Sequence, residues 1–202
     1  MLKVIHDFHE LKDLVLIVPT SFSDNRGNFM ELYNRRALSE KGLNRLFVQD
    51  NIVSSKKGVL RGLHFQKYHQ QGKLVSVING KIFDVVVDIR EESDTFGKWF
   101  GIVLSKANKK QLYVPEGFAH GYLVLEDDTL VYYKCTDYYY PEEQEGIIWD
   151  DKDLKINWKD LIYNENNPNI SKLADGTQIV LSNYDKDNKS IIEIFNRRKD
   201  DL

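Results

Sequence analysis

The sequence predicts a mainly β fold, a sandwich or barrel with a few short peripheral helices. From residue 47 onward, short runs rich in β-branched and aromatic residues recur, and Gly, Asn or Asp residues separate them. Strands at this spacing are typical of sandwiches and barrels. The chain has 202 residues, a length that suits one domain with a buried core. We therefore expect residues 1–202 to form a single β domain.

The N-terminal part, residues 1–46, predicts two strands and a helix ahead of the main β region. Polar turn residues separate the two strands, and a glycine ends the helix. The expected elements are a strand over 15–22 with a turn at 23–27, a strand over 29–33, and a helix over 35–41 closed by Gly42.

The central part predicts the walls of the sandwich or barrel. Its apolar runs cover residues 74–78, 81–89, 98–104, 111–115, 122–126 and 130–135. Asn79-Gly80 lies between two of these runs, and this dipeptide is a strong signal for a hairpin turn. We expect the two flanking strands to pair.

The C-terminal part, residues 150–202, predicts an extension of the domain rather than a second one. Residues 150–175 are polar and rich in Asn, which indicates a loop with a short helix. Residues 179–182 fit one more strand, and residues 189–202 fit a terminal helix. Too few apolar residues remain here to build a separate core.

The composition excludes several classes of function. The 28 basic and 31 acidic residues give a net charge of −3, so no general surface for nucleic acid or membrane is expected. The start of the chain lacks the apolar core of a signal peptide, and we expect a cytoplasmic protein. The single cysteine, Cys135, can form no disulfide within the chain and reads as a small apolar residue in a strand.

A first cluster of chemically active residues covers residues 58–66, with Lys73 shortly after it. If this strand is regular, His64 shares one face with Gly62, and Arg61 lies on the other face. An Arg and a His this close could serve an anionic ligand and a proton transfer. Taken alone, however, the cluster favours a solvated strand edge with a core histidine.

A second cluster covers residues 115–121, where a Pro-Gly turn delivers His120 at the start of the next strand. The spacing Pro-x-Gly-x-x-His is the second half-motif of the cupin barrels. In metal cupins the first half-motif supplies His-x-His and a Glu, but here it reads His64-Phe-Gln66 with no Glu in the next ten residues. Two histidines are too few ligands to hold a metal ion in a cupin site. We therefore predict a cupin, or jelly-roll, barrel without a metal.

Longer motifs resemble one family, the dTDP-4-dehydrorhamnose 3,5-epimerases. The resemblance covers roughly residues 22–158 without large gaps. The motifs that carry it are DNRGNFMELYN (24–34), FVQDN (47–51), GVLRGLHFQ (58–66), GKLVSVINGKIFDVVVDIR (72–90), TFGKW (95–99), QLYVPEGFAHGYLVLED (111–127) and YKCTDYY (133–139).

The resemblance implies proton chemistry beside a ketone. Enzymes of this family act on a nucleotide-diphosphate 4-keto-6-deoxy sugar, in which the C4 ketone acidifies the hydrogens on C3 and C5. By resemblance His64 is the base, because imidazole exchanges a proton near neutral pH. Tyr133 matches the proton donor, and Lys73 and His120 match groups that bind the sugar and the developing oxyanion. The substrate already carries its ketone, so no cofactor is expected.

The carboxylate that orients His64 has two candidates. The family pairs its histidine with an Asp in a Leu-Ser-x-x-Asp pattern, which fits Asp185 here. Asp84, inside a predicted strand, is a second acid that could hold a histidine or could simply bond at a strand end. In the family pattern a Lys that contacts the nucleotide precedes the Asp, and Tyr184 stands in its place. Residues 163–178 are also longer than the family pattern.

Further residues match family positions around the sugar, diphosphate and nucleobase. They are Phe22, Arg26, Glu31, Gln49, Asn51, Arg61, Tyr139 and Glu145. The forked guanidinium of Arg61 suits a diphosphate. The resemblance also implies a homodimer in which N-terminal strands within residues 1–46 lie at the interface and complete the partner's pocket.

Several functions remain open at this point. The leading one is a 3,5-epimerase of a dTDP-linked 4-keto-6-deoxy hexose. The alternatives are the same chemistry on a GDP-linked 4-keto-6-deoxy hexose or heptose, and inversion of a single centre. A ketoisomerase and a non-catalytic sugar-binding cupin are different classes. The donor Tyr133 argues against the first, and the joint presence of a base and an acid argues against the second.

Overall fold

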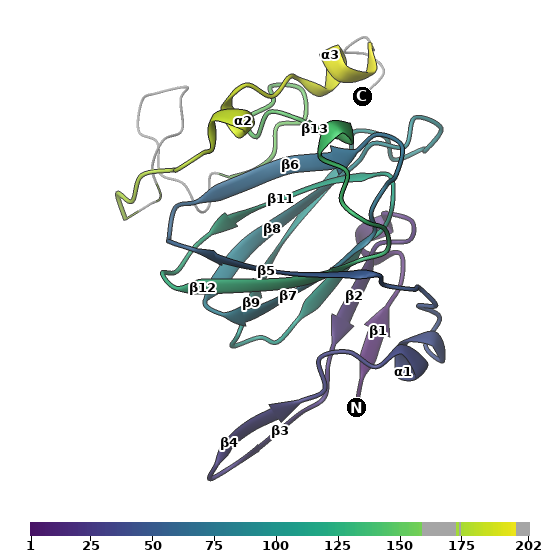
Figure 1. The fold of residues 1–202 in the computed structure, drawn as a ribbon, viewed down its shortest axis with the longest axis vertical. Helices are drawn as coiled ribbons and strands as arrows, with labels where there is room; N and C mark the ends of the chain where they lie inside the picture. The colour runs from purple at the N-terminus through teal and green to yellow at the C-terminus, as the bar shows by residue number, and fades with distance from the viewer. Residues whose placement is uncertain (159–172, 174, 197–202) are drawn as a thin grey trace.

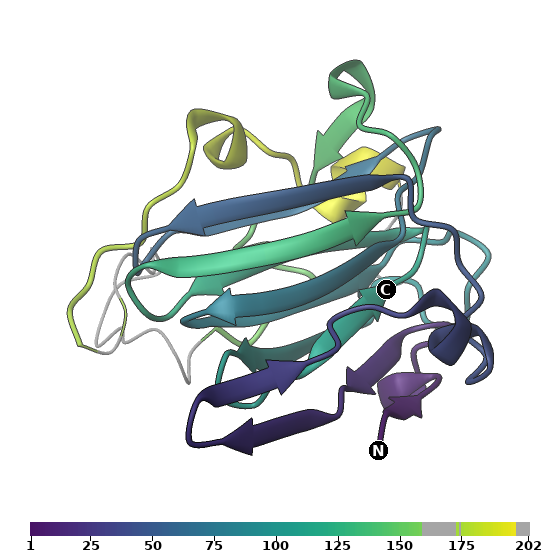
Figure 2. The same ribbon diagram turned by 60° about the horizontal axis from the view of Figure 1, so that its bottom comes forward.

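The computed structural model describes residues 1–158, 173 and 175–196, and it has the predicted mainly β architecture. Two antiparallel sheets face each other and form the barrel (Figures 1 and 2). The six-stranded sheet has the order β1 (Lys3–Ile5), β2 (Val15–Val18), β10 (Gln111–Val114), β7 (Lys73–Asn79), β12 (Thr129–Cys135), β5 (Gln49–Ser55). The five-stranded sheet has the order β13 (Gln144–Gly146), β6 (Leu60–Gln66), β11 (Phe118–Val124), β8 (Lys81–Asp88), β9 (Trp99–Ser105).

Short elements surround the barrel. The ribbon of β3 (Ser21–Asp24) and β4 (Gly27–Met30) projects away from it at the lower end of Figure 1. Two short 3₁₀ helices cover Phe8–Glu10 and Pro141–Glu143. The α-helices are α1 (Arg35–Ser39), α2 (Asn183–Lys186) and α3 (Ile191–Phe195). Of the described residues, no helix is long and apolar enough to cross a membrane.

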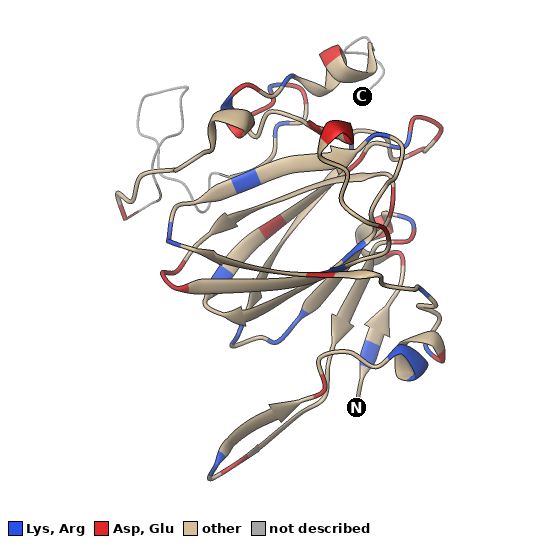
Figure 3. Ribbon diagram, in the orientation of Figure 1, with Lys and Arg blue, Asp and Glu red and all other residues tan. Residues whose placement is uncertain are grey.

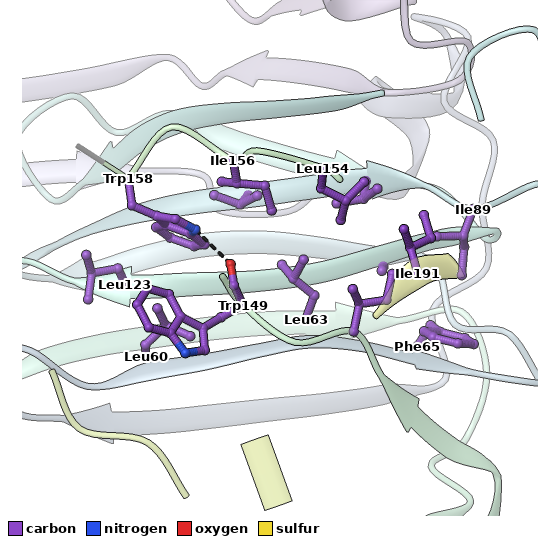
Figure 4. Close-up of a cluster of buried hydrophobic side chains, with 14 of the residues drawn as sticks. Leu60, Leu63, Phe65, Ile89, Leu123, Trp149, Leu154, Ile156, Trp158 and Ile191 are labelled. Carbon is purple, nitrogen blue, oxygen red and sulfur yellow. Dashed lines mark hydrogen bonds between the residues drawn. The ribbon is translucent and has the colours of Figure 1, made fainter. Parts of the chain in front are cut away.

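Alternating side chains divide the apolar residues between two cores. On β11, Phe118 and Val124 point between the sheets, whereas Ala119 and Leu123 point to the outer face of the five-stranded sheet. The outer core is closed by residues from the C-terminal extension, including Trp149, Leu154, Ile156, Trp158 and Ile191 (Figure 4). The Trp158 indole N–H donates to the Trp149 carbonyl at 2.9 Å. The extension is therefore packed on the barrel.

The predicted hairpin at Asn79-Gly80 is wrong. The chain does turn there, with Gly80 at φ +77°, but β7 pairs with β10 and β12 while β8 pairs with β9 and β11. The turn therefore carries the chain from one sheet to the other. A Cβ on Gly80 would lie 2.1 Å from the Thr129 hydroxyl oxygen, so both the backbone conformation and the space require glycine.

Three expected boundaries in the N-terminal and central parts need correction. The strand expected over 15–22 is two strands, because Pro19 interrupts it between β2 and β3. The strand expected over 29–33 ends at Met30. The strand expected to begin at residue 122 begins at Phe118, so His120 lies inside β11 rather than at its start. The helix after Asn34 is confirmed, since the Asn34 side chain caps α1 and Gly42 follows at φ +90°.

The C-terminal extension also differs from the expectation. Residues 179–182 form no strand; only an isolated bridge joins Val180 to Val59. The expected terminal helix is present as α3, which a Ser190–Glu193 capping box begins and Asn196 in the left-handed region ends. The expected helix within 150–175 falls largely on residues 159–172 and 174, which lie outside the described residues, as do 197–202.

Candidate active site

A cavity of about 270 Å³ lies between the two sheets, and α2 borders it. Figure 3 shows a basic band near the start of β6 and an acidic band within β8. The acid in the middle of β8 is Asp84, which is fully buried. The residues that line the cavity are Val53, Arg61, His64, Lys73, His120, Gly121, Tyr122, Tyr133, Gln144, Ser182, Tyr184 and Asp185.

The irregular course of β6 brings Arg61 and His64 to the same cavity. The register between β6 and β11 shifts, because His64 lies opposite His120 while Arg61 lies opposite Tyr122. Three steps along β6 thus match two steps along β11, so one extra residue is accommodated in β6. Gly62 makes this possible at φ +113°, where a Cβ would lie 2.6 Å from the Gly121 Cα. The strand is therefore not regular, and the opposite faces expected of a regular strand do not apply to Arg61 and His64.

His64 is held by Asp185, the first of the two candidate acids. Nε2 of His64 lies 2.5 Å from Oδ1 of Asp185, and the Ser182 hydroxyl donates to Oδ2 at 2.6 Å. Burial raises the pKa of Asp185, but hydrogen bonds from His64, Ser182 and the Gly62 N–H outweigh it and lower that pKa below 3.8. Asp185 is therefore ionised and accepts from Nε2–H, which leaves Nδ1 of His64 free to accept a proton.

Asp84, the second candidate, holds the other histidine. Nε2 of His120 lies 2.9 Å from Oδ2 of Asp84, inside the five-stranded sheet. Lys73 reaches the cavity from β7 in the opposite sheet. Burial lowers the pKa of Lys73, and the nearby Cys135 and Asp84 oppose that shift. Two nitrogen groups, one from each sheet, thus line the cavity close to the first pair.

Tyr133 lies across the cavity from His64. It comes from β12 of the six-stranded sheet, whereas His64 and His120 come from the five-stranded sheet. Burial raises the pKa of Tyr133, Cys135 adds to that rise and Arg61 opposes it, so the phenol is protonated at neutral pH. A base and an acid on opposite walls can reach the two faces of one flat intermediate.

The cavity lining does not include four other predicted binding residues, Gln49, Asn51, Tyr139 and Glu145. Asn51 sits opposite Tyr133 in the β5–β12 register, and the Gln49 side chain accepts from the Tyr139 N–H at 3.0 Å. The Oε1 atom of Glu145 lies 3.5 Å from Nζ of Lys67. The cavity is lined by the neighbouring residue Gln144 rather than by Glu145.

The N-terminal ribbon does not reach the cavity of its own chain. Phe22 is 62% exposed and pairs in register with Phe29, which is 68% exposed. Arg26, at the tip, is bound to Asp24 at 2.6 Å, and Glu31 is exposed just after β4. The predicted roles of Phe22, Arg26 and Glu31 in binding stay predictions.

Sequence reasoning missed Tyr122, Gln144 and Ser182 among the lining residues. Tyr122 could have been found, since it follows His120 by two positions and strand alternation places both on one face. Ser182 stands in the pattern that indicated Asp185. Gln144 carries no signal, because its position depends on the pairing of β13 with β6.

The structure also bears on two further features of the sequence, the possible metal ligands and the single cysteine. Among the described residues, no three His, Cys, Asp or Glu side chains are arranged to hold a metal ion. Cys135 is fully buried, and burial raises the pKa of its thiol. A buried, protonated thiol behaves as a small apolar residue, in line with the prediction.

Comparison with known proteins gives concordant results. The family model of dTDP-4-dehydrorhamnose 3,5-epimerase matches residues 9–193. A protein of that name from Methanothermobacter thermautotrophicus is 49% identical over 170 residues, which is 82% of this chain and 92% of the relative.

Solved structures agree in fold. The dTDP-6-deoxy-D-glucose-3,5-epimerase of Legionella pneumophila, in complex with dTDP-4-keto-L-rhamnose, has a TM-score of 0.83 and 42% identity, covering 95% of this chain and 93% of that one. A 3′-monoepimerase from Streptomyces bikiniensis, in complex with dTDP-quinovose, has a TM-score of 0.81 and 26% identity, covering 95% and 91%.

Proposed function

This chain belongs to the dTDP-4-dehydrorhamnose 3,5-epimerase family, and we propose that it inverts C3 and C5 of a dTDP-linked 4-keto-6-deoxy hexose through an enolate. It is an isomerase of nucleotide sugars. The observation that carries the mechanism is the His64–Asp185 pair on one wall of the cavity and the Tyr133 phenol on the other. Epimerisation needs a base and an acid on opposite faces of the same carbon.

In the first step His64 takes a proton from C3 or C5. Its Nε2 is bound to Asp185, so Nδ1 is the accepting nitrogen. The carboxylate of Asp185 stabilises the imidazolium that forms and fixes the orientation of the ring. The C–H electron pair passes into the sugar ring and onto the C4 oxygen.

Lys73 and His120 are proposed to stabilise the enolate oxygen. Both line the cavity, and donors aimed at a developing charge in a site with little water contribute strongly to catalysis. Asp84 fixes the His120 ring through Nε2 and thus leaves its other edge for the substrate. We assign no catalytic role to Asp84 itself.

Tyr133 is proposed to return a proton to the opposite face. Its raised pKa keeps the phenol protonated until the enolate forms, and an enolate carbon is basic enough to accept that proton. The phenolate then regains a proton from solvent. Arg61, which extends over the same cavity, is the candidate for the diphosphate.

The relatives favour a dTDP sugar and two inverted centres over the alternatives. The relative at 42% identity is a 3,5-epimerase with a bound dTDP sugar, whereas the 3′-monoepimerase is 26% identical. The fold alone does not separate the two reactions, because both structures match with similar TM-scores.

We further propose a homodimer in which the β3–β4 ribbon lies against the partner. A cross-strand pair of exposed phenylalanines, Phe22 and Phe29, supports this proposal, as does Ile52 on the edge strand β5, which is 64% exposed. Such a dimer would bring the ribbon's Phe22 and Arg26 to the partner's cavity. Sedimentation of the wild type and of a Phe22→Ser/Phe29→Ser variant tests it; a wild-type monomer would contradict it.

Deuterium incorporation tests the function. The protein is incubated in D₂O with dTDP- and GDP-linked 4-keto-6-deoxy hexoses, and label at C3 and C5 is followed by NMR. We expect label at both centres of the dTDP sugar only. Tyr133→Phe should reduce inversion by on the order of 10²-fold while exchange continues, because His64 still forms the enolate. The absence of label with every 4-keto sugar would exclude an enolate mechanism.

A further inference from the structure

Tyr184 lines the cavity but has no part in the mechanism above. It precedes Asp185 on α2, and its ring meets the His64 ring edge to face, with centroids 5.6 Å apart and planes at 60°. Its hydroxyl donates to the Gln144 carbonyl at 2.8 Å. The side chain therefore links three elements around His64: α2, which carries Asp185; β13, which carries Gln144; and β6, which carries His64 itself.

The strand that Tyr184 contacts, β13, pairs directly with the strand that carries His64. Gly146 of β13 lies opposite His64 in register, and Gln144 lies opposite Gln66. The Tyr184 hydroxyl thus anchors at the strand next to the base, and its ring spans the space between that strand and α2. Burial raises the pKa of Tyr184, and Tyr139, Glu145 and Asp185 add to the rise although the bond to Gln144 opposes it. The hydroxyl therefore keeps the proton that it donates.

We propose that Tyr184 is a positioning residue that covers the His64–Asp185 pair and restricts the exchange of the abstracted proton with water. The inference rests on the function proposed above. The geometry suits it: the Tyr184 ring lies against the His64 ring, the Asp185 side chain is almost fully buried, and the His64 side chain is only a quarter exposed. Water that is excluded from a reacting group cannot take up its proton.

The proton that His64 removes has two fates. The C–H bond at C3 or C5 breaks, its electron pair enters the enolate, and the proton resides on Nδ1 of His64. It can return to the same face, which regenerates the substrate, or Tyr133 can protonate the other face, after which His64 releases its proton to solvent. If Tyr184 restricts exchange, returned substrate carries its original hydrogen rather than one from solvent.

A nucleotide contact is the competing role for Tyr184, since 44% of the residue is exposed. The two roles predict different measurements. Loss of a nucleotide contact raises KM and leaves the balance between exchange and inversion unchanged. Loss of the Tyr184 ring over His64 changes the balance between exchange and inversion, whether or not KM changes.

The experiment measures deuterium in recovered, uninverted substrate per inversion event, in D₂O at low conversion, with the dTDP-linked 4-keto-6-deoxy hexose. Wild type is compared with Tyr184→Ala, Tyr184→Phe and a control, Tyr68→Ala. Tyr68 is 74% exposed and is absent from the cavity lining. The phenylalanine variant keeps the ring over His64 but loses the bond to Gln144.

We expect the ratio of deuterium in uninverted substrate to inversion events to be at least about threefold above wild type in Tyr184→Ala. The same ratio should rise less in Tyr184→Phe and should keep the wild-type value in Tyr68→Ala. An unchanged ratio in Tyr184→Ala, with or without a raised KM, would overturn the inference, as would an equal rise in Tyr68→Ala. If wild type neither exchanges nor inverts the sugar, the proposed function itself fails, and that result is distinct from the other two.

Discussion

The two His–Asp pairs of the cavity are neighbours with the same chemistry but different construction. His64 and His120 lie opposite each other on β6 and β11, and each bonds a carboxylate through Nε2. The His120–Asp84 pair is buried, with side chains 9% and 0% exposed, and both residues belong to one sheet. In the other pair His64 is 25% exposed, and Asp185 comes from α2 in the C-terminal extension.

The difference in construction indicates a difference in role. A pair fixed inside a sheet suits a constant hydrogen-bonding group, because its geometry is set by strand register. A pair at the edge of the cavity, with one ring nitrogen free, suits a group that gains and loses a proton in each turnover. We therefore expect substitutions in the two pairs to affect different steps.

The largest difference in activity is expected between substitutions of the two histidines. His64→Asn should reduce both exchange and inversion by on the order of 10³-fold or more, because the base is lost. His120→Asn should reduce inversion by about 10²-fold and leave exchange detectable, because it removes one donor to the enolate oxygen. Deuterium exchange in D₂O, with folding checked by circular dichroism, measures both. If exchange survives in His64→Asn and disappears in His120→Asn, the two roles are reversed.

Substitution of Asp185 should mainly affect activity, and substitution of Asp84 should mainly affect stability. Asp185→Asn should reduce kcat by on the order of 10²-fold and lower the urea midpoint less than Asp84→Ala does, because the acid orients and stabilises a proton-transfer base at the cavity edge. Asp84→Ala should lower the free energy of unfolding by about 1–3 kcal/mol, because it leaves the buried His120 donor without its partner. Equal losses of stability in both variants would remove the distinction between the pairs.

The sequence indicated the His64–Asp185 pair, through the family pattern, but not the pairing of Asp84 with His120. His120 and Asp84 meet through the pairing of β11 with β8, and sequence patterns do not set the register of two strands that are distant in the chain. The His64–Asp185 contact joins residues 121 positions apart and depends on a short helix, so only the five-residue family pattern Leu-Ser-x-x-Asp indicated it. Local rules also failed where tertiary structure overrides them: the Gly62 irregularity turns Arg61 inward, and the Asn79-Gly80 turn changes sheets instead of forming a hairpin.

A smaller effect on kcat and stability is expected from substitution of Ser182, which binds Asp185 of the His64–Asp185 pair and caps α2. Its hydroxyl donates to Asp185 and also accepts from the Asp185 N–H at 3.0 Å as the cap of α2. Ser182→Ala should cost about 1 kcal/mol of stability and about fivefold in kcat, since cap and carboxylate bond are lost together. Ser182→Thr keeps both bonds and serves as the control. An unchanged kcat in Ser182→Ala would mean that His64 and the Gly62 N–H fix the carboxylate without the hydroxyl.

The smallest expected effect is a pH dependence of stability that belongs to Asp185. Its pKa in the folded protein lies below the ordinary 3.8, so its contribution is complete above that value and is lost as pH falls through the folded pKa. The stability advantage of wild type over Asp185→Asn should therefore be constant above about pH 5 and shrink towards pH 3. Urea unfolding of both proteins at pH 7, 5 and 3 measures the difference. An advantage that grows on acidification would mean that the carboxylate is protonated in the folded state, and the assignment of Nδ1 as the accepting nitrogen would lose its basis.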